Sequence, residues 1–195
     1  MKFENEITVE IDIEFEKLES ILKENNFKVI EIYDLKDVYL LNKNFHKRDD
    51  YLDILNNCVL VRHIIEENKD TKYITYKYKE YNDQKEIIKQ GKINCSINSI
   101  DEAKQLLEAL NYEEIIKIYD HSIVYSNGID ELVVQMVNNK HIYIEIEDKC
   151  YNINRKYKNV DEMKEVISKY NIPIKNNNYF VKKAEIEMLE SFKNN

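Results

Sequence analysis

The N-terminal part of the chain changes from an alternating to a helical pattern of apolar positions, and then to an extended one. Between Glu6 and Ile13, isoleucine or valine occupies every second position. A period of two residues predicts a β-strand with one buried face. From Phe15 to Asn26 the apolar residues recur at helical spacing, which predicts an amphipathic helix. Phe27 to Leu41 is rich in β-branched and aromatic residues and predicts a second strand.

Strand-like patterns return through the middle of the chain. We expect further strands over Cys58–Ile65, Thr71–Tyr81, Glu86–Ile97, Leu132–Val137 and His141–Asp148. The dipeptide Asn127-Gly128 stands between two β-rich runs, which predicts a hairpin. Residues 42–57 are polar and predict a loop with one helical turn. The basic residues of this loop are Lys43, Lys47 and Arg48.

A second amphipathic helix is expected after Ser99. Glu102 follows Ser99 by three residues, as in a capping box, which places the start of the helix there. The apolar stripe expected to be buried consists of Ala103, Leu106, Leu107 and Leu110.

The C-terminal part of the chain predicts two more helices, over Val160–Tyr170 and Tyr179–Phe192, with Pro173 between them. No Gly- or Ser-rich linker separates this part from the rest. We therefore expect residues 1–195 to form a single domain, with residues 150–195 as a helical appendage packed on it.

Two stretches of the chain resemble one another. Ile32-Tyr33-Asp34 recurs as Ile118-Tyr119-Asp120, and both copies follow a predicted helix. Such a repeat indicates a domain with a pseudo-twofold axis, although chance similarity is the alternative in a chain rich in Ile, Lys, Tyr and Glu. About eight strands and flanking helices predict an antiparallel α+β protein. A repeated helix-and-strands unit would allow the strands to close into an eight-stranded β-barrel without exposed edges.

Composition excludes several classes of protein. The chain of 195 residues carries a net charge of −8 and no basic cluster, which argues against nucleic acid and against an anionic membrane surface as partners. No run of apolar residues is long enough to span a membrane, and the polar N-terminus is unlike a signal peptide. The cysteines Cys58, Cys95 and Cys150 are widely spaced and fit free thiols, so we expect a cytoplasmic protein.

Charged side chains share one face of several predicted strands. Carboxylates at alternate positions, such as Glu145 and Glu147, are natural ligands for Mg²⁺ or Mn²⁺, which prefer oxygen. Basic residues such as Arg62 and Lys77 would suit phosphate oxygens. Two interpretations stay open on this pattern alone: the charged faces are the solvated outer faces of an ordinary sheet, or they line a barrel that binds a metal and a polyanion.

The order of these motifs resembles the CYTH superfamily of triphosphate tunnel proteins, which includes class IV adenylate cyclases and thiamine triphosphatases. The matching segments run along nearly the whole chain: the opening strand at Glu6–Glu10, Asp37-Val38-Tyr39, Val59–Arg62, Thr75-Tyr76-Lys77, Glu145-Ile146-Glu147 and the tail Ala184–Leu189. The resemblance implies a tunnel-like barrel and a metal-dependent enzyme acting on a nucleotide or organic triphosphate, either a phosphohydrolase or a cyclase.

The resemblance also implies roles for particular residues. Glu6, Glu145 and Glu147 would bind Mg²⁺ or Mn²⁺. Arg62, Lys77 and Lys79 would bind the phosphate groups of a small-molecule substrate, and Tyr39 and Lys77 would take part in catalysis.

Several motif positions depart from the superfamily's pattern. Basic residues are replaced at Glu10, Leu60, Asp120 and Ser122, the second glutamate of the opening motif is Thr8, and the usual acid before the last strand is Gln135. Each lost charge-assisted hydrogen bond removes roughly 1.5–3 kcal/mol. Two alternatives stay open: a shifted alignment in which Lys117 supplies a replacement cation, and a catalytically degenerate barrel that binds a small ligand or a metal.

Overall fold

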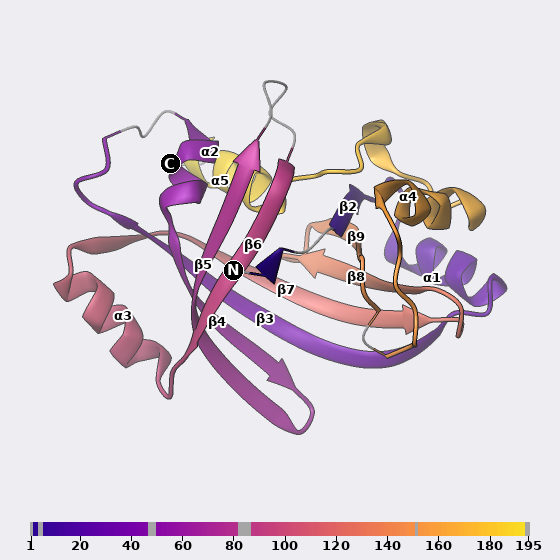
Figure 1. Cartoon of the computed structure of the whole chain (residues 1–195), viewed down its shortest axis with the longest axis horizontal. Coiled ribbons are helices and arrows are strands. Elements are labelled where there is room, and N and C mark those ends of the chain that lie inside the picture. Colours follow the sequence, from indigo (N-terminus) through magenta and orange to yellow (C-terminus); the bar gives the residue numbers. More distant parts are fainter. Residues whose placement is uncertain (1, 4–5, 47–49, 82–86, 151, 194–195) are drawn as a thin grey trace. The chain divides into compact units, whose positions relative to one another are not determined.

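The computed structural model describes residues 2–3, 6–46, 50–81, 87–150 and 152–193 (Figure 1). Its strands are β1 Lys2–Phe3, β2 Glu6–Glu10, β3 Lys28–Asn42, β4 Val59–Glu66, β5 Lys69–Tyr81, β6 Ile87–Ser96, β7 Tyr112–Ser126, β8 Glu131–Val137 and β9 His141–Glu147. Its helices are α1 Phe15–Glu24, α2 Tyr51–Asn57, α3 Ile100–Ala109, α4 Val160–Lys169 and α5 Lys183–Lys193, with a 3₁₀ turn η1 at Lys175–Asn177. Glu86, the predicted start of a strand, and the basic loop residues Lys47 and Arg48 lie outside the described residues.

The strands form an antiparallel sheet, which confirms the α+β class. In the described part of the chain the hydrogen-bonded order is β1-β6-β5-β4-β3-β7-β8-β9-β2, which is the eight strands expected together with the two-residue β1. Within the described ranges no pairing joins β1 to β2. A closed tunnel therefore stays a prediction. No helix in the described part of the chain is long and apolar enough to cross a membrane.

The chain divides into two compact units. Unit 1 consists of residues 1–3, 34–119 and 182–195, and unit 2 consists of residues 4–33 and 120–181. The long strands β3 and β7 each contribute residues to both units. The expected appendage over residues 150–195 is shared between the units, because α4 belongs to unit 2 and α5 to unit 1. That the whole chain acts as a single domain stays a prediction.

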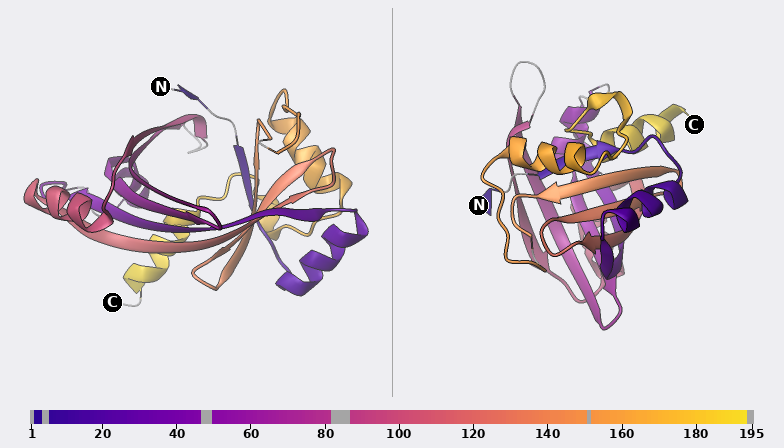
Figure 2. Two further views of the ribbon diagram at one scale, coloured as in Figure 1. Left: turned by 90° about the horizontal axis from the view of Figure 1, so that it is seen from below. Right: turned by 90° about the vertical axis from the view of Figure 1, so that its right-hand side faces the viewer.

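The core of unit 2 lies between one face of its strands and two helices. The alternation in β2 places Ile7 and Val9 in this core, both fully buried. Leu18 of α1 and Met163 of α4 pack against the same apolar face, and the two helices lie beside this part of the sheet (Figures 1 and 2). Because side chains alternate along a strand, the opposite face carries the polar residues of β2, β8 and β9.

One apolar cluster of unit 1 packs a narrow row of α3 against β4. Ala103 and Leu107, one helical turn apart, are buried together with Val61 of β4. The prediction was wrong for Leu106 and Leu110, which are 55% and 59% exposed. Leu106 flanks the contact row, and Leu110 is the C-cap and follows the last helical turn. The predicted cap is confirmed, because the Ser99 side chain accepts a hydrogen bond from the Glu102 backbone N–H.

Two helix-and-strand segments of equal length correspond to the repeat seen in the sequence. α1 and α3 each have ten residues, and β3 and β7 each have fifteen. An asparagine in the left-handed conformation joins helix to strand in both copies: Asn26 has φ 62° and Asn111 has φ 67°. Asn171, with φ 52°, follows α4 in the same way. Asparagine tolerates this conformation better than most residues, and it ends the helix.

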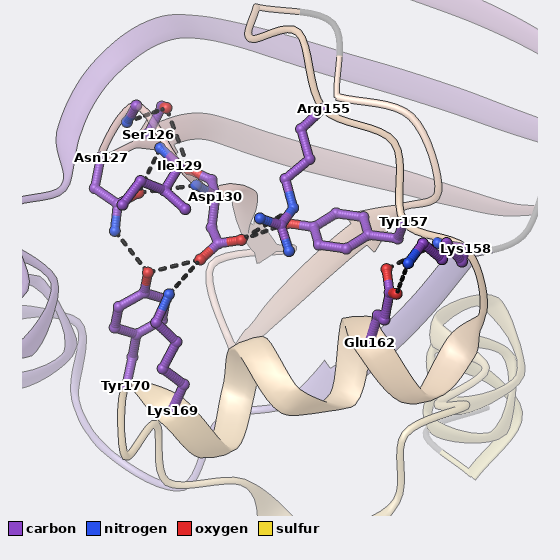
Figure 3. Close-up of polar contacts among 11 residues, drawn as sticks. Ser126, Asn127, Ile129, Asp130, Arg155, Tyr157, Lys158, Glu162, Lys169 and Tyr170 are labelled. Atoms are coloured by element: carbon purple, nitrogen blue, oxygen red, sulfur yellow. Dashed lines mark hydrogen bonds and ion pairs between the residues drawn. The ribbon is translucent and has the colours of Figure 1, made fainter.

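The predicted hairpin at Asn127-Gly128 is confirmed, and its turn is tied to the C-terminal part of unit 2. Asp130, which is 1% exposed, accepts hydrogen bonds from the hydroxyl groups of Tyr157 (3.2 Å) and Tyr170 (2.6 Å). Lys169 Nζ lies 3.0 Å from the same carboxylate, and Arg155 Nε lies 3.3 Å from it (Figure 3). This network connects the β7–β8 turn to α4.

Candidate functional site

The register of β2 and β9 brings the predicted metal ligands together. Glu6 pairs with Glu147, and Thr8 pairs with Glu145. Since directly paired residues of antiparallel strands point to the same side, all four side chains belong to the polar face of unit 2. The register is fixed by the intervening apolar pair of Ile7 and Ile146, which are buried in the core on the other face.

Glu6, Glu145 and Glu147 form a cluster whose geometry fits a divalent cation. One carboxylate oxygen of each residue lies within 4.8 Å of those of the other two, and all three residues are half-buried. Ligands that coordinate one Mg²⁺ at about 2.1 Å lie roughly 3–4 Å apart, so small rotations of the side chains would place the three oxygens on one ion. Three carboxylates this close repel one another, and a bound cation would relieve that repulsion.

A buried polar network lies on the same face, near the cluster. Ser122 Oγ donates to Asp120 Oδ1 at 2.9 Å, and both residues are buried. Burial raises the pKa of Tyr33, the charges of Glu145, Asp120 and Glu147 raise it further, and a hydrogen bond with Ser122 acts in the opposite direction. Tyr33 therefore stays a neutral phenol beside the carboxylates. The sequence did not identify it as a site residue, although it belongs to the repeated Ile-Tyr-Asp motif.

Glu10, which replaces a basic residue of the superfamily's opening motif, is itself bound by basic groups. Its Oε1 atom lies 2.9 Å from Lys175 Nζ and 3.2 Å from His141 Nδ1. Lys175 comes from the segment after α4, far from Glu10 in the sequence. Sequence patterns could not indicate this contact, because nothing in the spacing of the two residues links them.

Arg62, a predicted phosphate ligand, forms a buried ion pair within unit 1. Its Nε and Nη2 atoms donate to the two oxygens of Asp37 at 2.7 and 2.6 Å. Burial alone would raise the pKa of Asp37, but the charge and hydrogen bonds of Arg62, with the charges of Lys77 and Lys183, lower it overall. Asp37 stands at the Asp of the Asp37-Val38-Tyr39 motif, and it fixes the orientation of the guanidinium group.

The other predicted phosphate and catalytic residues also belong to unit 1. The pairing of Arg62 with Tyr73, and of Leu60 with Thr75, places Lys77 and Lys79 on the same face of the sheet as Arg62. Tyr39 lies two residues after Asp37 on β3 and is 5% exposed. The polar face of unit 1 is therefore rich in basic groups, whereas the polar face of unit 2 is rich in acidic groups.

The remaining residues that differ from the superfamily's motifs also have defined positions in the structure. Leu60 is buried opposite Thr75, and Gln135 is buried opposite Ser122 and Tyr143. Lys117 does not compensate for the lost cations, because its side chain is 68% exposed and lies 3.0 Å from Glu114. The placement of Asp120 and Ser122 at the basic positions of the motif stays a prediction.

Comparison with solved structures identifies the fold, whereas comparison of the sequence finds no related protein. No family model and no curated protein matches the chain. Among solved structures, the PH1819 protein from Pyrococcus horikoshii aligns over 98% of this chain and 99% of its own, with a TM-score of 0.67 and 13% identity. An adenylyl cyclase candidate from Hippeastrum, described as having a dominant triphosphatase activity, aligns over 96% of each chain, with a TM-score of 0.62 and 9% identity.

A further similar structure is a component of an assembly. A chain of the Mediator head module from Schizosaccharomyces pombe aligns over 86% of this chain and 96% of its own, with a TM-score of 0.60 and 8% identity. At these identities the similarity concerns the fold alone. The chain therefore shares the fold of these structures, which agrees with the resemblance to the CYTH superfamily in the order of its motifs.

Proposed function

We propose that the chain is a metal-dependent enzyme of the CYTH type that acts on a nucleotide or organic triphosphate, as a phosphohydrolase or an adenylate cyclase-like enzyme. The observation that supports this proposal is the cluster of Glu6, Glu145 and Glu147, whose oxygens gather within 4.8 Å on the polar face of unit 2. Carboxylate oxygens in this arrangement suit Mg²⁺ or Mn²⁺. A similar structure described as a triphosphatase agrees with this class of chemistry.

Each unit contributes its own chemistry to the proposal. In unit 2 the three glutamates would hold the cation, which when bound neutralises phosphate charge. In unit 1, Arg62, Lys77 and Lys79 would bind phosphate oxygens, with Asp37 keeping the Arg62 guanidinium in place. Tyr39 and Lys77 are the proposed catalytic residues, and a cytoplasmic location belongs to the same proposal.

Thermal unfolding with and without Mn²⁺, in the presence of ATP, thiamine triphosphate or inorganic triphosphate, tests the proposal. A ligand at a hundredfold excess over its dissociation constant stabilises the native state by about 2.7 kcal/mol. We expect a metal-dependent rise in the unfolding temperature with one triphosphate, followed by phosphate release or cyclic nucleotide formation when that compound is incubated with the protein.

The substitution Glu145→Gln should remove the effect of the metal, because it replaces a charged ligand by a neutral one of the same size. Glu165→Gln is the matched control, since Glu165 is exposed on α4 of the same unit. A metal response that survives Glu145→Gln would show that the cation binds elsewhere.

A second function, a barrel that binds a small ligand or a metal without catalysis, is favoured by one specific observation. Glu10 and Asp120 place acidic groups where the superfamily's pattern has basic ones, and both lie on the polar face of unit 2. The similar Mediator chain shows that the fold is also used in an assembly component. Stabilisation by Mn²⁺ alone or by spermidine, with no response to any triphosphate, would support this alternative.

A further inference from the structure

The outer edge of β2 is covered by a C-terminal segment of unit 2, residues 173–181. The backbone N–H of Thr8 donates to Tyr179 O at 3.1 Å, and Val181 N–H donates to Thr8 O at 2.9 Å. At the other end of the segment, Ile174 forms a β-bridge with Ile11 and packs against the core of unit 2. The segment is therefore anchored on both sides of η1.

This anchoring directs Lys175 to the polar face of β2. Lys175 begins η1, where Asn176 and Asn177 both adopt left-handed conformations, with φ of 57° and 48°. Its Nζ atom lies 2.9 Å from Glu10 Oε1, and His141 Nδ1 lies 3.2 Å from the same oxygen. The Lys175 side chain is 45% exposed, and its ion pair with the half-buried Glu10 holds the ammonium group over this face.

Glu10, the partner of Lys175, belongs to the same polar face of β2 as Glu6 of the carboxylate cluster. Glu6, Thr8 and Glu10 alternate on the polar face of β2, and Glu10 pairs with Tyr143, which lies two residues from Glu145 on β9. Two residues of a strand span about 6–7 Å. The position of Glu10, the partner of Lys175, is therefore about 6–7 Å along the strands from that of Glu145, a span of one or two phosphate groups.

We propose that Lys175 binds a phosphate group of the metal-bound triphosphate and that Glu10 and His141 are positioning residues for its ammonium group. The inference rests on the proposed function and deepens it. An ammonium group has three N–H donors, so Lys175 can keep its bond to Glu10 while another donor binds a phosphate oxygen. Lys175 would supply, from the C-terminal segment, a positive charge in place of the one that the superfamily's pattern has at the position of Glu10.

The test is a titration of each variant with ATP and with inorganic triphosphate at saturating Mn²⁺, by calorimetry. We expect Lys175→Ala to weaken triphosphate binding about ten- to a hundredfold, the value of one charge-assisted hydrogen bond. Lys175→Arg should restore most of the affinity. The matched control is Lys158→Ala, because the Lys158 side chain is 86% exposed in the same unit and its Nζ atom lies 3.8 Å from Glu162 Oε1.

A titration with Mn²⁺ alone separates this role from a structural one. Lys175→Ala should bind Mn²⁺ within about twofold of the wild type and unfold at a similar temperature, because the carboxylate that Lys175 binds belongs to Glu10, which is not one of the three cluster glutamates. Equal triphosphate affinity in Lys175→Ala and the wild type would overturn the inference and leave the proposed function intact. A wild type that binds no triphosphate would overturn both.

Discussion

Carboxylates of this protein are used in two opposite ways. Asp37 is buried and paired with one arginine, whereas Glu6, Glu145 and Glu147 are gathered with one another. A buried carboxylate is stable only when a partner neutralises it, and carboxylates that lie close together repel one another. The first arrangement stabilises the fold, and under the proposed function the second binds a cation.

Replacing Asp37 by Asn should destabilise unit 1 strongly. The substitution leaves Arg62, whose side chain is 18% exposed, without its carboxylate partner. Breaking a buried ion pair in this way costs about 3–5 kcal/mol. The measurement is the midpoint of urea unfolding, with Asp161→Asn as control, since Asp161 is 83% exposed. A change below about 1 kcal/mol would contradict the stabilising role of the pair.

The pH dependence of stability checks the same pair. The folded state lowers the pKa of Asp37 below its ordinary value of 3.8. A depressed pKa stabilises the folded state above the unfolded-state pKa, and this contribution is lost as the pH falls through the folded-state value. The difference in stability between the wild type and Asp37→Asn should therefore shrink as the pH is lowered from 5 towards and below 3.8.

At the scale of the elements, asparagines in the left-handed conformation set where helices end. Asn26, Asn111 and Asn171 each stand directly after the C-cap of a helix. In α1, the N–H of Phe27 then returns to Leu22 O at 2.9 Å, which satisfies a carbonyl at the helix end. The turn between helix and strand is thus specified by one residue type.

Substitutions at Asn111 should separate backbone conformation from side-chain contacts. Asn111 has φ 67° and is exposed. Asn111→Ala should cost about 1 kcal/mol, because alanine adopts this conformation at a steric cost. Asn111→Gly should be neutral within a few tenths of a kcal/mol, because glycine has no Cβ. Urea unfolding of both variants measures the difference, and equal stability of the two would show that conformation is unimportant at this turn.

At the scale of the whole molecule, contacts between distant segments hold the candidate site in place. The β7–β8 turn is joined to α4 through Asp130 (Figure 3), and β2 is joined to residues 173–181 by backbone hydrogen bonds. Both contacts belong to unit 2, which also contains the glutamate cluster. The C-terminal segments are therefore part of the structure that fixes β2.

Replacing Asp130 by Ala should loosen this connection. The substitution removes the acceptor of Tyr157, Lys169 and Tyr170 and should cost roughly 3 kcal/mol. Amide hydrogen exchange should accelerate most in α4 and in the β7–β8 turn, because local stability is lost where the contacts are lost. Uniform acceleration across both units would show that the network acts on global stability instead.

Much of the secondary structure could be predicted, because the burial of side chains repeats with the period of each element. The alternation of Ile7 and Val9 predicted β2, and the helical spacing of Leu18 and Leu22 predicted α1. Leu106 was misplaced because spacing gives the apolar side of a helix but not the width of its contact. Tyr33 was missed because a tyrosine in a strand carries no signal of the charges around it.

The sequence by itself determined the antiparallel α+β class, the turn at Asn127-Gly128 and the candidate metal ligands on β2 and β9, since backbone preferences and periodic burial are encoded within a few neighbouring residues. Only the tertiary structure decided that Glu6 pairs with Glu147, that Asp37 holds Arg62 and that Lys175 reaches Glu10. These contacts depend on strand register and on segments far apart in the chain. The packing of the core sets that register, and no local pattern contains it.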